Sequence, residues 1–251
     1  VVNVFDNRIP RSRPEGGFEG DVMAAYSTVD EGRTIGGQAN MGLGDHLVLH
    51  LDGNDRDADE YEIPGFASEE AEEEGVDGFV ENTQSEARSG TAGLSWIGDR
   101  GYVGLSVGLQ EGRYGVPGAK KKEEEEEEEE GPISIDFEQV RVDLDSEYNF
   151  DDGLVKLAKF RLGWSDYEHT ELAGDEPETL FTNEEWELRA EAFLNDYAFG
   201  AGVATGIVGL NVADREFEAQ GDEAFVPRNE QFRLGVFGLG RYSLDPLILE
   251  A

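Results

Sequence analysis

The stretch that decides the fold is 102–110, which reads Tyr102-Val103-Gly104-Leu105-Ser106-Val107-Gly108-Leu109-Gln110. From the second residue onward, aliphatic side chains alternate with glycine or polar residues. Successive side chains of a β-strand point to opposite faces, so this alternation predicts a strand with one apolar face and one small, polar face.

The same period of two recurs along most of the chain. The further segments that show it are 46–52, 91–96, 139–145, 159–165, 185–192, 203–212 and, less clearly, 232–241. Weaker strands are expected near 20–28 and 33–43, and a last one begins near Leu247. The sequence therefore predicts an all-β protein with about ten or eleven strands.

The connections between these segments alternate in length. Tight turns near 44–45, 98–101, 195–196 and 243–246, with a moderate link at 149–157, are separated by long acidic loops at 55–88, 111–132, 168–184 and 213–230. Only the first connection, near 29–32, is short where a long one is expected. Short turns at one end and long loops at the other are typical of an antiparallel up-and-down transmembrane β-barrel. So few strands predict a partial barrel, an open curved sheet. The alternative is a soluble or secreted acidic β-sandwich that binds Ca²⁺ or carbohydrate, in which the apolar faces would point into a shared core.

Aromatic residues near the short turns favour the barrel. Interfacial aromatic girdles are expected where strands leave the bilayer. The candidates are Trp96, Tyr102, Tyr148, Phe193, Tyr197, Phe199 and Tyr242. The charged face of segment 185–192 is expected to line the barrel interior; it consists of Glu185, Glu187, Arg189 and Glu191.

Composition limits the function. The 251 residues include 57 Asp and Glu against 20 Lys and Arg, which gives a formal net charge of −37. So acidic a chain argues against binding of nucleic acid or an anionic leaflet, because both need clustered basic residues. Cysteine is absent from the sequence. Neither a catalytic triad motif nor a phosphate-binding loop is recognisable, so we expect no enzyme.

Two groups of residues are candidate metal ligands. The first is an acidic tract after three lysines: Glu123, Glu124, Glu125, Glu126, Glu127, Glu128, Glu129 and Glu130. Carboxylates alone suit hard cations, and such a tract can also be only a solvated acidic segment. The second is His169 with the neighbouring acids Asp166, Glu168 and Glu171, which would bind zinc together with a ligand from another loop. A surface histidine with no ligand is the alternative there.

Several motifs carry a family resemblance. The opening Val1-Val2-Asn3-Val4-Phe5-Asp6-Asn7-Arg8-Ile9-Pro10 resembles the last plug strand of a TonB-dependent outer-membrane receptor. Asp59-Glu60-Tyr61-Glu62-Ile63-Pro64-Gly65-Phe66 and Trp96-Ile97-Gly98-Asp99-Arg100-Gly101-Tyr102 are similar to segments of its zinc-uptake branch. The tract between Tyr114 and Ile135 stands where zinc-type relatives carry a histidine-rich insert, but it contains no histidine.

The resemblance implies an organisation and a function. Residues 1–12 would be the end of the plug domain, and residues 13–251 the N-terminal half of the barrel. The whole protein would import a scarce substrate across the outer membrane of a Gram-negative bacterium. The cargo would be a divalent metal, zinc first, or a metal complex, with no resident cofactor. The TonB–ExbB–ExbD complex would supply the energy through the plug and its TonB box, which this sequence does not include.

Overall fold

The computed structural model describes residues 7–122, 129–221 and 224–250, and these are mostly antiparallel strands. A 12-stranded sheet has the order β1-β2-β3-β6-β7-β8-β9-β10-β12-β13-β14, with β11 paired to β12. Along this path each strand pairs with the next one of the sheet in the chain, which is the up-and-down topology expected from the sequence. Strands β4 and β5 form a separate two-stranded sheet.

The element bounds are as follows. The first half of the chain holds β1 (Phe18–Tyr26), β2 (Arg33–Leu43), β3 (Leu47–Ala58), β4 (Tyr61–Phe66), α1 (Glu69–Glu74), β5 (Asp77–Val80), β6 (Ser85–Gly98) and β7 (Gly101–Lys122), after a short 3₁₀ turn (Glu15–Gly17). The second half holds β8 (Glu129–Asn149), β9 (Val155–Ala173), β10 (Glu176–Leu194), β11 (Tyr197–Phe199), β12 (Gly202–Gly221), β13 (Asn229–Leu244) and β14 (Leu247–Glu250). Among the described residues, no helix has the length and hydropathy needed to cross a bilayer.

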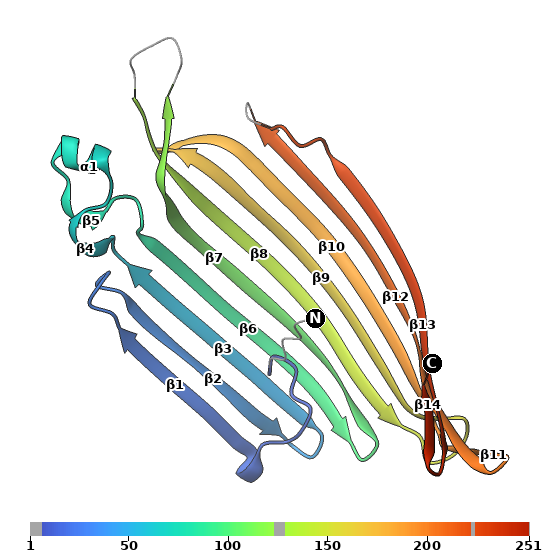
Figure 1. Cartoon of the computed structure of the whole chain (residues 1–251). Helices are drawn as coiled ribbons and strands as arrows, with labels where there is room; N and C mark the ends of the chain where they lie inside the picture. The colour runs from blue at the N-terminus through green and yellow to red at the C-terminus, as the bar shows by residue number, and fades with distance from the viewer. Residues whose placement is uncertain (1–6, 123–128, 222–223, 251) are drawn as a thin grey trace.

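The main sheet is a single curved layer, open between β1 and the last strands (Figure 1). Its N-terminal segment lies over one face of the sheet, which we call the concave face. The opposite, convex face carries exposed aliphatic side chains: Leu51 is 48%, Leu105 48% and Leu109 59% exposed. The partial barrel is thus confirmed and the β-sandwich is wrong, because no second sheet covers this face in the described part of the chain.

The aromatic girdle is only partly as predicted. Trp96 is 49% exposed on the convex face near the short turns, and Tyr197 and Phe199 are each 66% exposed beside them. Tyr102 and Phe193 were wrongly expected in this girdle. Tyr102 is only 9% exposed and donates a hydrogen bond to Asp145 on the concave face. Phe193 shares that face, because it alternates in phase with the inward-facing residues of β10.

The strands are longer than the sequence pattern indicated. The predicted segment 55–88 is a long connection that contains β4, α1 and β5. It is shorter than predicted, because it begins at 59 and ends at 84. Most of the predicted loops 111–132, 168–184 and 213–230 is strand instead. Strands β9 and β10, for example, are joined only by Gly174 and Asp175.

These loop bounds were wrong because the convex face of the strands changes from apolar to acidic partway along their length. On β9 the convex residues change from Phe160, Leu162 and Trp164 to Asp166 and Glu168. The period of two continues, but the apolar face that marked the strand ends. Neighbouring strands change in the same way, and Glu111, Glu138 and Glu168 lie opposite one another on three of them.

Counted from the short turns, the first acidic residue on the convex face divides each of these strands in two. We call the part from this acid onward the upper tier, and the part beside the short turns the lower tier. The upper tier comprises 111–118 of β7, 133–138 of β8, 166–173 of β9, 176–184 of β10 and 214–221 of β12. A row of acids cannot face lipid without a large free-energy cost, so only the lower tier matches a bilayer. Trp164 and Trp186, which pair across strands, lie just below this boundary, as interfacial tryptophans do.

Candidate functional site

The described N-terminal residues pack against glycine and serine residues of the concave face. A Cβ atom at Gly93 would collide with the carbonyl oxygen of Arg8, and one at Gly104 would collide with Ile9. Ser95, beside them, is fully buried. These glycines therefore allow the segment to lie directly on the sheet, which is a common reason for glycine inside a strand.

A charged network fixes the same segment laterally. The Arg11 guanidinium donates to Oδ2 of Asp145 at 2.8 Å, and the Tyr102 hydroxyl donates to the same oxygen at 3.0 Å. Arg161 lies 3.7 Å from the other carboxylate oxygen. Asp145 is only 9% exposed, so its charge depends on these partners. Arg13 donates to the carbonyl oxygens of Gly44 and Asp45 in the first short turn, at 2.7 and 2.8 Å.

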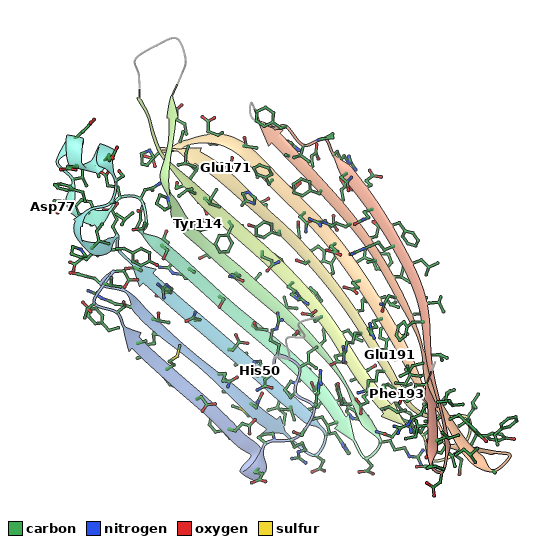
Figure 2. All side chains as sticks on the ribbon, in the orientation of Figure 1. His50, Asp77, Tyr114, Glu171, Glu191 and Phe193 are labelled. Carbon is green, nitrogen blue, oxygen red and sulfur yellow. The ribbon has the colours of Figure 1, made fainter. Side chains whose placement is uncertain are left out.

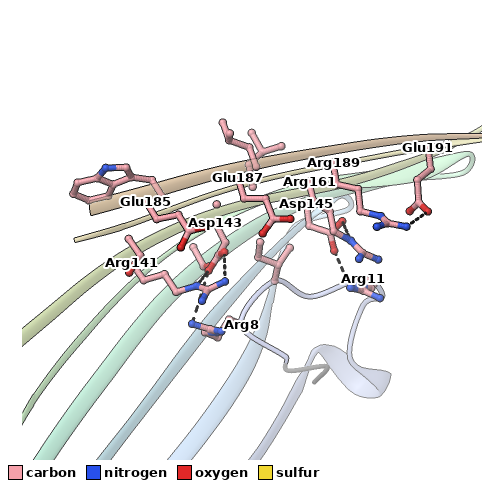
Figure 3. Close-up of a pocket in the computed structure, with 17 residues that line it drawn as sticks. Arg8, Arg11, Arg141, Asp143, Asp145, Arg161, Glu185, Glu187, Arg189 and Glu191 are labelled. Carbon is pink, nitrogen blue, oxygen red and sulfur yellow. Dashed lines mark hydrogen bonds and ion pairs between the residues drawn. The ribbon is translucent and has the colours of Figure 1, made fainter. Parts of the chain in front are cut away.

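A cleft of about 790 Å³ lies between this segment and the concave wall of β8, β9 and β10 (Figure 3). Arg141 donates twice to Asp143, at 2.8 and 2.9 Å, and Arg189 donates to Glu191 at 2.7 Å. The cleft also receives the other charged residues of 185–192, as the sequence predicted; its charged lining is Arg8, Arg11, Arg141, Asp143, Asp145, Arg161, Glu185, Glu187, Arg189 and Glu191. Alternating charges of both signs suit a polar passage or a polar partner surface.

The four residues grouped around His169 divide between two faces. His169 and Glu171 lie on the concave face of β9 in the upper tier, whereas Asp166 and Glu168 lie on the convex face. Figure 2 shows Glu171 at the end of the sheet opposite Glu191 and Phe193. A strand thus separates the predicted ligands into two pairs. Among the described residues, no group of three or more His, Asp or Glu has the geometry to hold a metal ion.

His169 lies among aromatic rings. Its imidazole stacks on Phe181 with ring centroids 4.5 Å apart and an angle of 16° between the planes, and Tyr167 is 5.6 Å away. Burial lowers the pKa of His169, and the neighbouring Glu171 carboxylate opposes this shift in part. The buried Nδ1 atom has no hydrogen-bond partner among the described residues. A neutral imidazole is therefore favoured here.

The acidic tract is mostly beyond what the structure describes. Glu123 to Glu128 lie outside the described residues. Glu129 and Glu130 begin β8, and His169 lies on the neighbouring strand β9. Their prediction as metal ligands stays a prediction.

Sequence reasoning missed the residues that hold the N-terminal segment. Arg11 and Asp145 are 134 positions apart, and no local motif joins them. One signal was available: Gly104, Ser106 and Gly108 make the polar face of the first strand quoted above unusually small. A row of small residues on an inward face indicates that another segment of backbone approaches it.

Comparison with known proteins supports the fold. No family model matches the chain. A ferric enterobactin receptor (PfeA) mutant from Pseudomonas aeruginosa superposes with a TM-score of 0.60 and 10% identity, over 93% of this chain and 38% of that one. The copper transporter OprC matches with a TM-score of 0.56 and 11% identity, over 90% and 34%. BauA, the ferric preacinetobactin receptor from Acinetobacter baumannii, matches with a TM-score of 0.54 and 11% identity, over 92% and 41%.

The chain thus spans between 34% and 41% of the length of these three proteins. At such low identity the likeness is one of fold. The chain has the fold of part of the β-barrel that these receptors and this transporter share.

Proposed function

We propose that this chain is part of an outer-membrane receptor of the TonB-dependent kind, which imports a scarce metal as an ion or a complex. One observation carries the proposal: the sheet joins an apolar convex face to a charged concave face on which an N-terminal segment is seated. Lipid outside and a polar, occupied interior are what a plugged transmembrane barrel requires. The fold shared with a ferric enterobactin receptor and a copper transporter supports the same function.

The proposed location follows from the tiers. The lower tier presents exposed Val103, Leu105 and Val107 on its convex face, and these residues would face lipid in the outer membrane of a Gram-negative bacterium. The upper tier and the connection 59–84 would then stand outside the cell. The acidic residues of the upper tier and of this connection would attract cations to the mouth of the barrel through their electrostatic field.

In this proposal, residues 1–12 are the end of a plug whose remainder closes the lumen. The hydrogen bonds of Arg11 and Tyr102 to Asp145 would hold the last residues of the plug against the wall while cargo binds above. The TonB–ExbB–ExbD complex would pull on the plug from the periplasm and open a path along the charged cleft. Cargo would pass without any covalent bond being made or broken, so the protein would not be an enzyme.

The proposed cargo is either a bare divalent ion, zinc first, or a metal complex. His169 and Glu171 could contribute to a zinc site only with ligands from other elements, since Asp166 and Glu168 face the other way. The acidic tract could concentrate cations near the mouth.

Uptake by cells tests this function. The gene of the complete protein is deleted, and accumulation of zinc, copper and iron is measured under scarcity of each metal, with and without the restored gene. The proposal predicts that the uptake of at least one metal falls and that the restored gene recovers it. Unchanged uptake of all three metals, with no metal or chelate bound by the purified complete protein, would contradict it.

A further inference from the structure

The long connection between β3 and β6 is a small structure of its own at the upper-tier end of the sheet. We call residues 59–84, which contain β4, α1 and β5, the lobe. We call residues 115–118 and 131–134 the outer end of the β7–β8 hairpin. Figure 1 shows the lobe beside this hairpin. Strands β4 and β5 pair only with each other, so contacts other than strand pairing with the main sheet must hold the lobe in place.

Asn82 joins the lobe to the hairpin. Its Nδ2 atom donates to the carbonyl oxygen of Val116 at 2.9 Å and to that of Ile133 at 2.7 Å, on the two different strands of the hairpin. A carbonyl oxygen only accepts, so the amide must present its nitrogen to both. Asn82 is 7% exposed, and its φ of 61° is a left-handed conformation that asparagine adopts more readily than most residues.

The hairpin is irregular at the point where Asn82 contacts it. Regular pairing of β7 with β8 ends at Gly115 and Ser134, and the register then shifts. Val116 and Ile133 follow these residues within the shifted stretch. Such an irregularity disrupts the ladder of hydrogen bonds locally. The amide of Asn82 therefore adds two hydrogen bonds where the hairpin's own ladder is interrupted.

Further contacts surround this joint. Gly115 is buried, and a Cβ atom there would collide with the side-chain and main-chain oxygen atoms of Asn82. Glycine at this position allows the direct approach. The Gly115 N–H donates to the carbonyl oxygen of Gln84 at 3.1 Å, and the Asn82 N–H donates to Oε1 of Glu60 at 2.7 Å. These bonds fix the backbone on both sides of the amide as well as its side chain.

The next connections on either side are bonded to this pair. The Asp59 N–H of the lobe donates to the carbonyl oxygen of Asp30 in the β1–β2 turn at 2.8 Å. Gly174 of the β9–β10 turn donates to the carbonyl oxygen of Pro132 at 3.0 Å and accepts from Arg113 at 3.4 Å. Four connections are thus bonded neighbour to neighbour, and we call them the collar: 27–32, the lobe, the outer end of the β7–β8 hairpin, and 174–175.

We propose that Asn82 fixes the lobe to the β7–β8 hairpin, so that the collar moves as one rigid body. Surface connections are ordinarily more mobile than the sheet that carries them, and each can move alone. A buried amide that bonds both strands of a neighbouring hairpin removes that freedom. The inference goes beyond the proposed receptor function and does not depend on it. In such a receptor the collar would be a fixed side of the mouth, and connections outside the collar would open and close it.

Distances between pairs of spin labels in the complete purified protein test the collar. The absence of cysteine allows labels to be placed singly, at exposed positions. Glu72→Cys with Pro117→Cys spans the joint between the lobe and the hairpin. Pro117→Cys with Glu176→Cys spans the hairpin and the start of β10, and it does not cross Asn82. The second pair is therefore an internal control for the first.

Two variants of the same chemistry are compared. Asn82→Asp keeps the size of the side chain but turns an oxygen toward two carbonyl oxygens, so both hydrogen bonds are lost. Asn195→Asp is its matched control, because Nδ2 of Asn195 donates to the carbonyl oxygen of Gly153 at 2.7 Å in a short turn at the opposite end of the sheet. Each variant is first shown to fold by its heat-dependent shift on a gel.

We expect narrow distance distributions for both pairs in the unchanged protein. Asn82→Asp should about double the width for the pair that spans the joint and leave the other pair unchanged, since two hydrogen bonds of the joint are lost. Hydrogen exchange of the Gly115 amide should become about tenfold faster, because opening of the joint exposes it. Asn195→Asp should change neither the widths nor this exchange rate.

Several results would overturn the inference. They are broad distributions in the unchanged protein, widths in Asn82→Asp equal to those of the unchanged protein, and equal broadening in Asn195→Asp. If Asn82→Asp does not fold, Asn82→Gly replaces it with the same expectation, because glycine keeps the left-handed backbone and removes the amide.

The outcomes also separate this inference from the receptor function. Gene-dependent metal uptake together with a lobe that moves independently would overturn only the collar. A rigid collar without gene-dependent uptake of any metal would count against the receptor function and leave the collar in place.

Discussion

The lower and upper tiers of the sheet use the same strands and the same period of two, yet they place opposite chemistry on corresponding faces. The lower tier has aliphatic residues on its convex face and ion pairs on its concave face. The upper tier has acids on its convex face and aromatic rings on its concave face. The strand pattern alone therefore does not decide which face is apolar; the environment of each tier does. The position where the two faces exchange their chemistry marks the edge of the proposed membrane.

The largest expected effect comes from placing a charge on the convex face of the lower tier. Val107→Arg should destabilise the complete barrel by about 2–4 kcal/mol, because it moves a charge into lipid. The measurement is the free energy of unfolding in bilayers by urea titration. Glu168→Arg, on the convex face of the upper tier, is the control and should change stability little. Equal losses in both variants would remove the distinction between the tiers.

A smaller effect is expected where the N-terminal segment contacts the sheet. Gly104→Val introduces atoms where Ile9 lies, and overpacking of this kind costs about 1–3 kcal/mol. The segment should lift from its seat, so trypsin should cleave after Arg11 about tenfold faster in the folded complete protein. Gly108→Ala, on the same strand and face, should leave the cleavage rate near that of the unchanged protein. Unchanged cleavage in Gly104→Val would argue against the seat.

The charged network should contribute less. Asp145→Asn keeps the side-chain shape but removes the charge that Arg11 and Arg161 approach, and we expect a loss of about 1–2 kcal/mol. The matched change is Asp55→Asn in an exposed ion pair with Arg88, which should cost about 0–0.5 kcal/mol. Urea unfolding of the complete protein compares them. A loss in Asp55→Asn as large as in Asp145→Asn would contradict the role given to burial.

The smallest effect concerns the pH dependence of the upper tier. Burial lowers the pKa of His169, so the unfolded chain takes up a proton at a higher pH than the folded protein does. Its contribution to stability is therefore present at neutral pH and is lost as the pH falls through the ordinary histidine range. The free energy of unfolding should therefore fall less between about pH 7 and pH 5 in His169→Gln than in the unchanged protein. A titration of the imidazole by NMR that gives an ordinary or raised pKa would contradict this.

Sequence alone predicted the sheet and its lower tier because strands such as 102–110 alternate strictly between aliphatic residues and glycine or polar residues. It ended the strands too early because the convex residue after Trp164 is an acid, and the pattern no longer presented an apolar face. Tyr167 and His169 continued the alternation on the other face, so a search for aromatic alternation could have found the extended strand.

The sites were less accessible to sequence reasoning. The cleft lining of 185–192 followed from alternation within one strand. The contact between Arg11 and Asp145 depends on tertiary folding between distant positions, which one sequence does not reveal. The expected grouping of His169 with Asp166 and Glu168 assumed a flexible loop, whereas a regular strand turns these side chains to opposite faces.

The most direct test of the two tiers uses the absence of cysteine from this sequence. Single cysteines replace the convex residues Asp136, Glu138, Val142 and Leu144 of β8 in the complete protein, embedded in bilayers. Each variant then reacts with a membrane-impermeant maleimide. We predict rapid labelling at Asp136 and Glu138 and protection at Val142 and Leu144. Equal labelling along the strand, or protection at Glu138, would contradict the exchange of surroundings on which the account depends.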